Sequence, residues 1–232
     1  MKIRIMLVSC VALLGLGCGG KSSTALNGQP QTGVRVVNAY AQPVDVLVDG
    51  AVAVTGVAPG SVDTAPASAG SHVVALRAAG TTTTGLQMQT AQGSVQTIVA
   101  LRFGSTLAAD TIGDTNAIVP AGATKVRVLH LAPNAGQIQA ARTQPDWLSP
   151  PLIGWKDPFL YDSVHINDPL ANPYYQSTVG AWDVRVWRTP SEDSLGWAGT
   201  PARVTFDLKS GEKRTVLVLD KPGGGIELSV ID

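Results

Sequence analysis

An internal repeat constrains the fold of this chain more than any other feature of its sequence. Residues 34–39 read VRVVNA and residues 126–131 read VRVLHL, at an offset of 92. Two further matches follow in the same order: residues 70–76 with 180–186 at an offset of 110, and residues 93–101 with 211–219 at an offset of 118. Three matches in one order are typical of a duplicated unit. The rising offsets place insertions in the second copy.

Each copy has the pattern of a β-sandwich. Along one extended segment Val44, Val46 and Val48 point to one face, and Asp45, Leu47 and Asp49 point to the other. Asp49-Gly50 then predicts a type I′ hairpin turn. Similar short apolar runs recur with turn signals about every 8 to 12 residues. We therefore expect an all-β chain with two tandem immunoglobulin-like antiparallel β-sandwich domains. The likeness is architectural, because the Cys-Trp-Cys core and the tyrosine corner are missing.

The repeat and the composition together predict the domain boundaries. We assign residues 1–17 to a lipoprotein signal peptide, 18–32 to a flexible tether rich in Gly, Ser and Thr, 33–119 to the first sandwich, 120–124 to a linker, and 125–232 to the second sandwich, with an insertion at about 137–178.

The N-terminus has the layout of a secretory signal. Lys2 and Arg4 precede an apolar run over residues 5–16, which is too short to span a bilayer core of ~30 Å. The segment LGLGC that ends at Cys18 resembles a bacterial lipobox. The resemblance implies cleavage before Cys18 and attachment of lipid to its sulfur, and the lack of Asp after Cys18 favours the outer membrane. The alternative is a plain secreted protein cut near Gly17.

Composition excludes two classes of protein. The 17 basic and 17 acidic side chains cancel, and charged residues make up only 15% of the chain, so no basic face is available for nucleic acid. The only cysteines are Cys10 and Cys18. Because Cys10 leaves with the signal peptide, no disulfide framework is possible in the mature chain.

Metal and catalytic motifs are missing from the sequence. His72, His130 and His165 lie in separate segments without metal-binding spacing, and we expect packing or surface roles for them. The loose group Asp110, Asp114 and Asn116 lacks the glutamate of a calcium loop. No Gly-x-Ser-x-Gly motif is present, so we expect no metal and no cofactor, and a hydrolase is only a remote alternative.

The tryptophans are unevenly distributed, since all five lie in the second copy: Trp147, Trp155, Trp182, Trp187 and Trp197. Trp182 shares a face with Val184 and Val186, which predicts a core position, and Trp187 alternates to the other face. One interpretation is that these aromatic residues fasten the insertion to the sandwich. The other is a stacking platform for a glycan, built from Trp147, Trp155, Trp187 and Trp197.

Several blocks resemble a known family. Residues 33–39 (GVRVVNA), 43–50 (PVDVLVDG) and 69–76 (AGSHVVAL), with a second opening at residues 126–135, are similar to the bacterial envelope domain catalogued as domain of unknown function 4397. The resemblance implies a β-sandwich repeat on exported or lipid-anchored bacterial proteins. It implies no catalytic residues.

From these observations we expect a non-enzymatic, lipid-anchored protein of the bacterial cell envelope. Its two sandwiches would serve as a structural or binding module on the periplasmic or surface-exposed face, with an envelope protein or a glycan as partner. The alternative is a carbohydrate-binding surface protein that uses the Trp-rich second domain.

Overall fold

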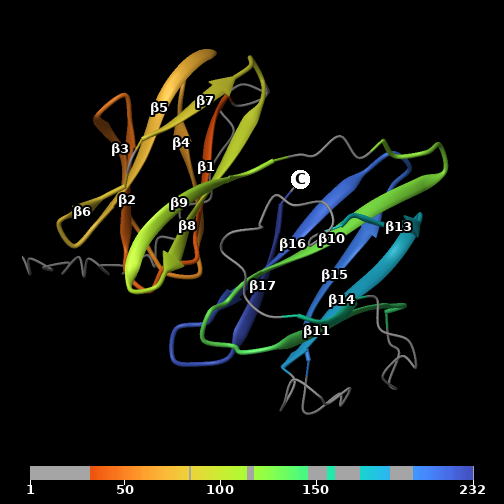
Figure 1. Cartoon of the computed structure of the whole chain (residues 1–232). Helices are drawn as coiled ribbons and strands as arrows, with labels where there is room; N and C mark the ends of the chain where they lie inside the picture. The colour runs from red at the N-terminus through yellow and green to blue at the C-terminus, as the bar shows by residue number, and fades with distance from the viewer. Residues whose placement is uncertain are drawn as a thin grey trace, which may run out of the picture.

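The computed structural model describes residues 32–83, 85–113, 118–145, 156–159, 173–188 and 201–231. These residues form an all-β structure, as predicted (Figure 1). None of them belongs to a helix long and apolar enough to cross a membrane. The predicted signal peptide, Cys18 and most of the tether lie outside the described residues.

The first half of the molecule contains the strands that its alternating pattern predicts: β1 (Gly33–Asn38), β2 (Val44–Val48), β3 (Ala51–Val57), β4 (Val62–Pro66), β5 (Gly70–Ala78), β6 (Thr81–Thr82), β7 (Leu86–Thr90), β8 (Val95–Phe103) and β9 (Thr106–Ile112). Asp49 and Gly50 both have positive φ, 51° and 81°, as the predicted type I′ turn requires. The turn joins β2 to β3 with only these two residues.

These strands form two sheets that pack face to face. One has the order β4-β1-β8-β9 and is called here the β1 sheet; the other has the order β3-β2-β5-β6, with β7 beside β5, and is called the β2 sheet. Val36, Val46, Leu76 and Ile98 come from both sheets and lie buried between them. The face of β2 that carries Val44 and Val46 is therefore the core face.

The second half contains β10 (Ala123–Leu131), β11 (Ile138–Thr143), β12 (Lys156–Phe159), β13 (Tyr175–Thr178), β14 (Gly180–Arg188), β15 (Ala202–Leu208), β16 (Lys213–Asp220) and β17 (Ile226–Ile231). The β10 sheet has the order β13-β10-β16-β17, and the β11 sheet has the order β12-β11-β14-β15. Val128, Ile138, Val186 and Val218 lie buried between these two sheets.

The pairing registers of the two halves correspond residue by residue. In the β1 sheet Val34 pairs with Gln96, and in the β10 sheet Val126 pairs with Arg214, which are the same positions at the offsets of 92 and 118. In the second pair of sheets the couples Gly70–Thr90 and Gly180–Leu208 correspond at 110 and 118.

The region predicted as an insertion, residues 137–178, contains regular strands. β11, β12 and β13 lie within it and occupy the sheet positions that β2, β3 and β4 occupy in the first half. The extra length of the second half falls between these strands, because residues 144–155 separate β11 from β12 where the first half has only the Asp49-Gly50 turn.

Two features of the predicted topology need correction. The sheets are not wholly antiparallel, since β1 runs parallel to β8 and β10 runs parallel to β16. These partners are distant in sequence, so no hairpin constrains their direction. An immunoglobulin constant domain also keeps its first, second, fourth and fifth strands in one sheet. Here β2 and β5 lie in the sheet opposite β1 and β4, so the two-layer architecture agrees with the prediction and the strand order differs.

A third apolar cluster joins the halves. It contains five buried side chains from the first half and the five at equivalent positions of the second: Val37, Ala39, Val99, Leu101 and Ile112 with Leu129, Leu131, Leu217, Leu219 and Ile231. All ten lie on the faces of the β1 and β10 sheets that point away from their own sandwich cores. Each half thus packs on the other with the same surface, as subunits do in an isologous interface.

Candidate functional site

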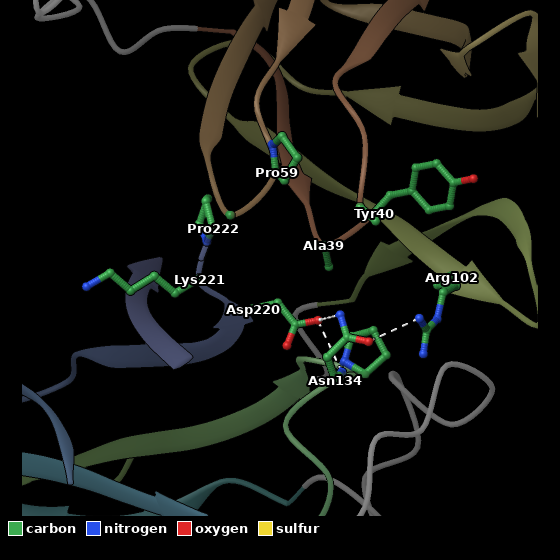
Figure 2. A pocket seen from close by; sticks show the side chains of 11 residues that line it. Ala39, Tyr40, Pro59, Arg102, Asn134, Asp220, Lys221 and Pro222 are labelled. Carbon is green, nitrogen blue, oxygen red and sulfur yellow. Dashed lines mark hydrogen bonds between the residues drawn. The ribbon is translucent and has the colours of Figure 1, made fainter. Parts of the chain in front are cut away.

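A pocket of about 260 Å³ opens beside this shared core, between the two halves (Figure 2). Its lining residues come from the loops after β1, β3, β10 and β16 and from the end of β8: Ala39, Tyr40, Ala41, Pro59, Gly60, Arg102, Pro133, Asn134, Asp220, Lys221 and Pro222. Five of these are alanine or proline, which makes much of the wall apolar. In Figure 2 the ring of Tyr40 points away from Pro59, Asp220 and Asn134, and it packs against the core of the first sandwich.

The pocket lies where corresponding loops of the two halves meet. Tyr40 and Ala41 follow β1 as Ala132 and Pro133 follow β10. At the ends of β8 and β16, Arg102 and Asp220 occupy equivalent positions at the offset of 118, and they carry opposite charges. The duplicated framework therefore brings a cation and an anion to the same side of the pocket.

An asparagine connects these two charges. The backbone N–H and the Nδ2 of Asn134 donate to Asp220 Oδ2, at 3.2 and 2.8 Å, and Arg102 donates from its guanidinium to Asn134 Oδ1 at 3.2 Å (Figure 2). Burial raises the pKa of Asp220, and the hydrogen bonds from Asn134 and the charges of Arg102 and Arg188 partly oppose that rise. Asn134 thus fixes the position of the carboxylate, and the surrounding donors and cations only partly offset the cost of burying its negative charge.

The two halves are in close contact at Gly60, in the turn before β4. Gly60 has a φ of 76°, and a Cβ added there would collide with the carboxylate of Glu227 and approach the backbone oxygen of Asp220. A side chain would therefore displace the Glu227 carboxylate, crowd the backbone of Asp220 and strain the positive φ of the turn. Glycine at this position lets one wall of the pocket rest directly on the other half.

Of the four tryptophans predicted as a ligand platform, only Trp187 lies within the described residues. Trp147, Trp155 and Trp197 lie outside the described residues. Trp187 lies on β14 with only 4% of its surface exposed, so its ring has no open face on which a ligand could stack. Trp182 packs against the core beside Val184 and Val186, as predicted.

Two contacts fix the position of the Trp182 ring, one at its Nε1 and one over its face. Its Nε1 donates to the backbone oxygen of Thr178 at 2.9 Å, and the guanidinium of Arg142 lies 4.1 Å from the ring centroid. Such a cation–π contact stabilises a partly buried aromatic ring. Trp182 is therefore an anchoring residue of the second sandwich.

His130 and Asn38 occupy equivalent positions and make equivalent hydrogen bonds. Asn38 Oδ1 accepts from the N–H of Tyr40, and its Nδ2 donates to the backbone oxygen of Val57 at 2.8 Å. His130 Nδ1 accepts from the N–H of Ala132 at 3.3 Å, and its Nε2 lies 2.7 Å from the backbone oxygen of Gly136. Each side chain accepts from the N–H two residues further along and lies against a backbone oxygen of the following loop, Gln42 for Asn38 and Gly136 for His130, so either residue can fill the position. The amide of Asn38 has a second N–H donor, and this reaches Val57.

Ser68, His72 and Asp49 form a group that resembles a hydrolytic triad in composition. His72 Nδ1 lies 2.7 Å from Asp49 Oδ2, and Nε2 lies 3.4 Å from Ser68 Oγ. However, Nε2 is closer, at 3.0 Å, to the backbone oxygen of Ser68, which can only accept a proton. Nε2 therefore acts as a donor and is not placed to remove a proton from Ser68.

The same group has perturbed titration. The hydrogen bond to Asp49 and the Ser68 carbonyl raise the pKa of His72, and the pKa of Asp49 is lowered by its bond to His72 and by the N–H of Val73. The cluster ties the β2–β3 turn to the loop before β5. Among the described residues no group of three His, Cys, Asp or Glu side chains could hold a metal ion. The third histidine, His165, lies outside the described residues.

Sequence reasoning did not single out Arg102, Asn134 or Asp220. One signal could have indicated them, because the repeat alignment pairs Arg102 with Asp220 and so shows opposite charges at one position of the framework. That they meet at Asn134 depends on the packing of the halves, which the repeat does not encode.

Comparison with known proteins gives a family match for part of the chain. Residues 32–141 match a family model described as "Domain of unknown function (DUF4397)". The match supports the resemblance predicted from the sequence over the first half, and it extends through β10 into β11. A search of curated proteins found no match.

Proposed function

We propose that this protein is a non-enzymatic lipoprotein of the bacterial cell envelope, anchored through Cys18, in which two tandem copies of an immunoglobulin-like sandwich act together as a structural or binding module. The similarity to an immunoglobulin domain is in the two-layer architecture and does not extend to the strand order. The equal strand order of the two halves and the agreement of their registers with the offsets 92, 110 and 118 support the duplication.

The observation that carries the proposal is the shared core between the halves. Ten buried apolar side chains at equivalent positions join the two sandwiches. Such a continuous apolar interface favours one rigid body over two domains that move independently. A rigid body with a pocket at its junction suits a role in scaffolding or binding.

The anchor rests on the N-terminal sequence. Lys2, Arg4, the apolar run and Cys18 have the order of a lipoprotein signal. Several acyl chains on one cysteine give stable membrane attachment, because each buried CH₂ contributes about 0.8 kcal/mol. The residues after Cys18 would then hold the first sandwich away from the lipid surface.

Membrane fractionation with mass spectrometry of the mature N-terminus tests the anchor. We expect the unaltered chain in the membrane fraction with an acylated Cys18, and Cys18→Ser in the soluble fraction. Cys10→Ser is the matched control and should leave fractionation unchanged, because Cys10 is removed with the signal. An unmodified mature N-terminus would refute the lipoprotein assignment.

A further inference from the structure

Asp220 lines the pocket between the halves, and one of its carboxylate oxygens accepts no hydrogen bond from the described residues. Asp220 Oδ2 receives both donors of Asn134, while no described residue donates a hydrogen bond to Oδ1. In Figure 2 the side chains of Asp220 and Asn134 lie across the pocket from Ala39. An oxygen in this position can accept a hydrogen bond from a ligand without breaking any contact of the protein.

The neighbouring polar groups are planar and close together. Asn134 lies between Asp220 and Arg102, so a carboxylate, an amide and a guanidinium follow one another along one side of the pocket. Groups of this kind offer acceptors and donors a few ångströms apart. That spacing suits a ligand whose own donors and acceptors are adjacent, as they are on neighbouring hydroxyl groups.

The remaining walls are apolar. Pro59, Pro133 and Pro222 line the pocket together with two alanines. Ligand sites commonly combine such apolar walls with a few fixed polar groups, and those for drug-sized molecules measure about 300 to 1,000 Å³. At about 260 Å³ this pocket suits a smaller ligand that has one apolar face and one polar edge.

The charges around the pocket disfavour a ligand with a net charge. Arg102 and Lys221 line it, so a cationic ligand would meet two positive groups. Asp220 itself and Glu227, which lies against Gly60, would repel an anionic ligand. Because positive and negative side chains both lie near the pocket, a neutral, hydroxyl-rich ligand would bind there with the smallest electrostatic cost.

We propose that the pocket between the halves binds one ring of a neutral sugar, with adjacent hydroxyl groups on Asp220, Asn134 and Arg102 and the apolar ring face against the prolines and alanines that line it. This inference gives a ligand class to the proposed binding role. It does not involve the tryptophans of the second half. The rigid contact at Gly60 and the shared core hold the pocket ready for its ligand, which limits the ordering cost of binding.

Saturation-transfer NMR on the full chain tests the proposal, since this method reports weak ligands and tolerates detergent. The probes are glucose, galactose and N-acetylglucosamine, compared with glucosamine and glucuronate, which add a positive or a negative charge to the same ring. We expect saturable binding of at least one neutral sugar with a Kd on the order of 1 mM, equivalent to about −4 kcal/mol. The charged analogues should bind more weakly.

Three variants locate the binding. Ala41→Trp places a large side chain at the exposed rim without removing any contact, and it should abolish the signal. Asp220→Ala removes the free acceptor and should weaken binding at least about tenfold. Asp207→Ala, at an exposed position near the end of β15, is the matched control and should bind as the unaltered chain does. Circular dichroism checks that each variant is folded.

Several results would overturn the proposal. It fails if no neutral sugar gives saturable transfer at concentrations in the tens of millimolar, if Ala41→Trp binds normally, or if a charged analogue binds more tightly than its neutral parent. None of these results bears on lipid attachment, which the mass of the mature N-terminus reports separately. Failure of the sugar site and failure of the anchor are therefore distinguishable.

Discussion

The outer faces of the β2 sheet and the β11 sheet occupy equivalent positions in the two halves. The face of the β2 sheet carries apolar residues and is partly exposed, whereas the face of the β11 sheet carries charged residues and is buried. In the first half Leu47 and Ala75 form a cross-strand pair on this face, and Val73 beside them is 39% exposed. In the second half the equivalent of Val73 is Asp183, which is fully buried, and Arg185 beside it is 7% exposed. Aliphatic residues meet solvent in one half and charges are buried in the other.

The buried charges of the second half are stable because they are paired. Asp183 Oδ1 accepts from Thr205 Oγ1 at 2.6 Å, and Oδ2 lies 3.1 Å from the guanidinium of Arg185 and 3.5 Å from that of Arg203. Burial of ions costs several kcal/mol unless partners compensate it. The comparison teaches that a duplicated framework fixes where a side chain points, whereas its surroundings fix whether the position is buried.

The largest expected effect comes from breaking the buried ion cluster. Asp183→Ala leaves the charge of Arg185 buried without this partner, and we expect the free energy of unfolding to fall by about 3–5 kcal/mol. Val73→Ala, the equivalent change on the exposed face, should stay within about 0.5 kcal/mol. Urea denaturation measures both. Equal losses at the two positions would mean that the faces do not differ as described.

The shared core gives the next largest effect, and here the halves should behave alike. Leu101 and Leu219 occupy equivalent positions in the cluster between the halves, with 1% and 0% exposure. Replacing either by Ala should cost about 2–5 kcal/mol.

Tryptophan fluorescence makes this test more specific, because all five tryptophans lie in the second half. If the halves unfold together, Leu101→Ala in the first half shifts the fluorescence midpoint as much as Leu219→Ala does. A midpoint that Leu101→Ala leaves unchanged would show that the halves unfold independently.

A smaller effect is expected where the halves use different residues for one role. Asn38→Ala and His130→Ala each leave buried loop groups without their hydrogen-bond partner, which should cost about 1–3 kcal/mol. His130→Asn should lose less than His130→Ala, since Asn offers the same kinds of donor and acceptor. Thermal unfolding compares the three variants. If His130→Asn is no better than His130→Ala, the two side chains are not interchangeable in function.

The smallest expected effect is the pH dependence that the His72–Asp49 pair gives to the first half. The pKa of His72 is raised above its ordinary value of 6.5, so its bonds to Asp49 and Ser68 stabilise the fold fully below pH 6.5 and progressively less as pH rises through the raised pKa. Asp49 has a lowered pKa, so its contribution is present above pH 3.8 and is lost as pH falls further.

Trp182, at the equivalent position of the second half, does not titrate. His72→Phe should therefore flatten the profile of the urea midpoint between pH 6 and pH 9, and Asp49→Asn should flatten it in the same range. A profile of the unaltered chain that stays level over this range would contradict the role of the His72–Asp49 pair.

The sequence predicted local structure well. Alternating valines located β2, the Asp49-Gly50 pair located its turn, and the three repeat offsets reappear in the strand registers. These features depend on short-range chemistry, since side-chain period and turn conformation are set within a few residues. The sequence also placed Trp182 in the core, on the face of Val184.

Other features depended on contacts between distant segments. The nearly continuous apolar run of β8 indicated that its outer side is apolar. The sequence did not predict that the equivalent side of β16 packs on it. Trp187 alternates away from the core valines, which left open either a ring that fastens the insertion or a ligand platform, and the structure buries it. Periodicity identifies the two faces of a strand and does not identify what packs on the second face.

The sequence alone therefore determined an all-β chain, the positions of its strands and the matching of its two halves, because each follows from local pattern. Tertiary structure alone decided the parallel central pairs, the single shared core and the meeting of Arg102, Asn134 and Asp220 in one pocket. The physical reason is that the free energy of these arrangements comes from burying surfaces contributed by residues far apart in the chain, which no local pattern records.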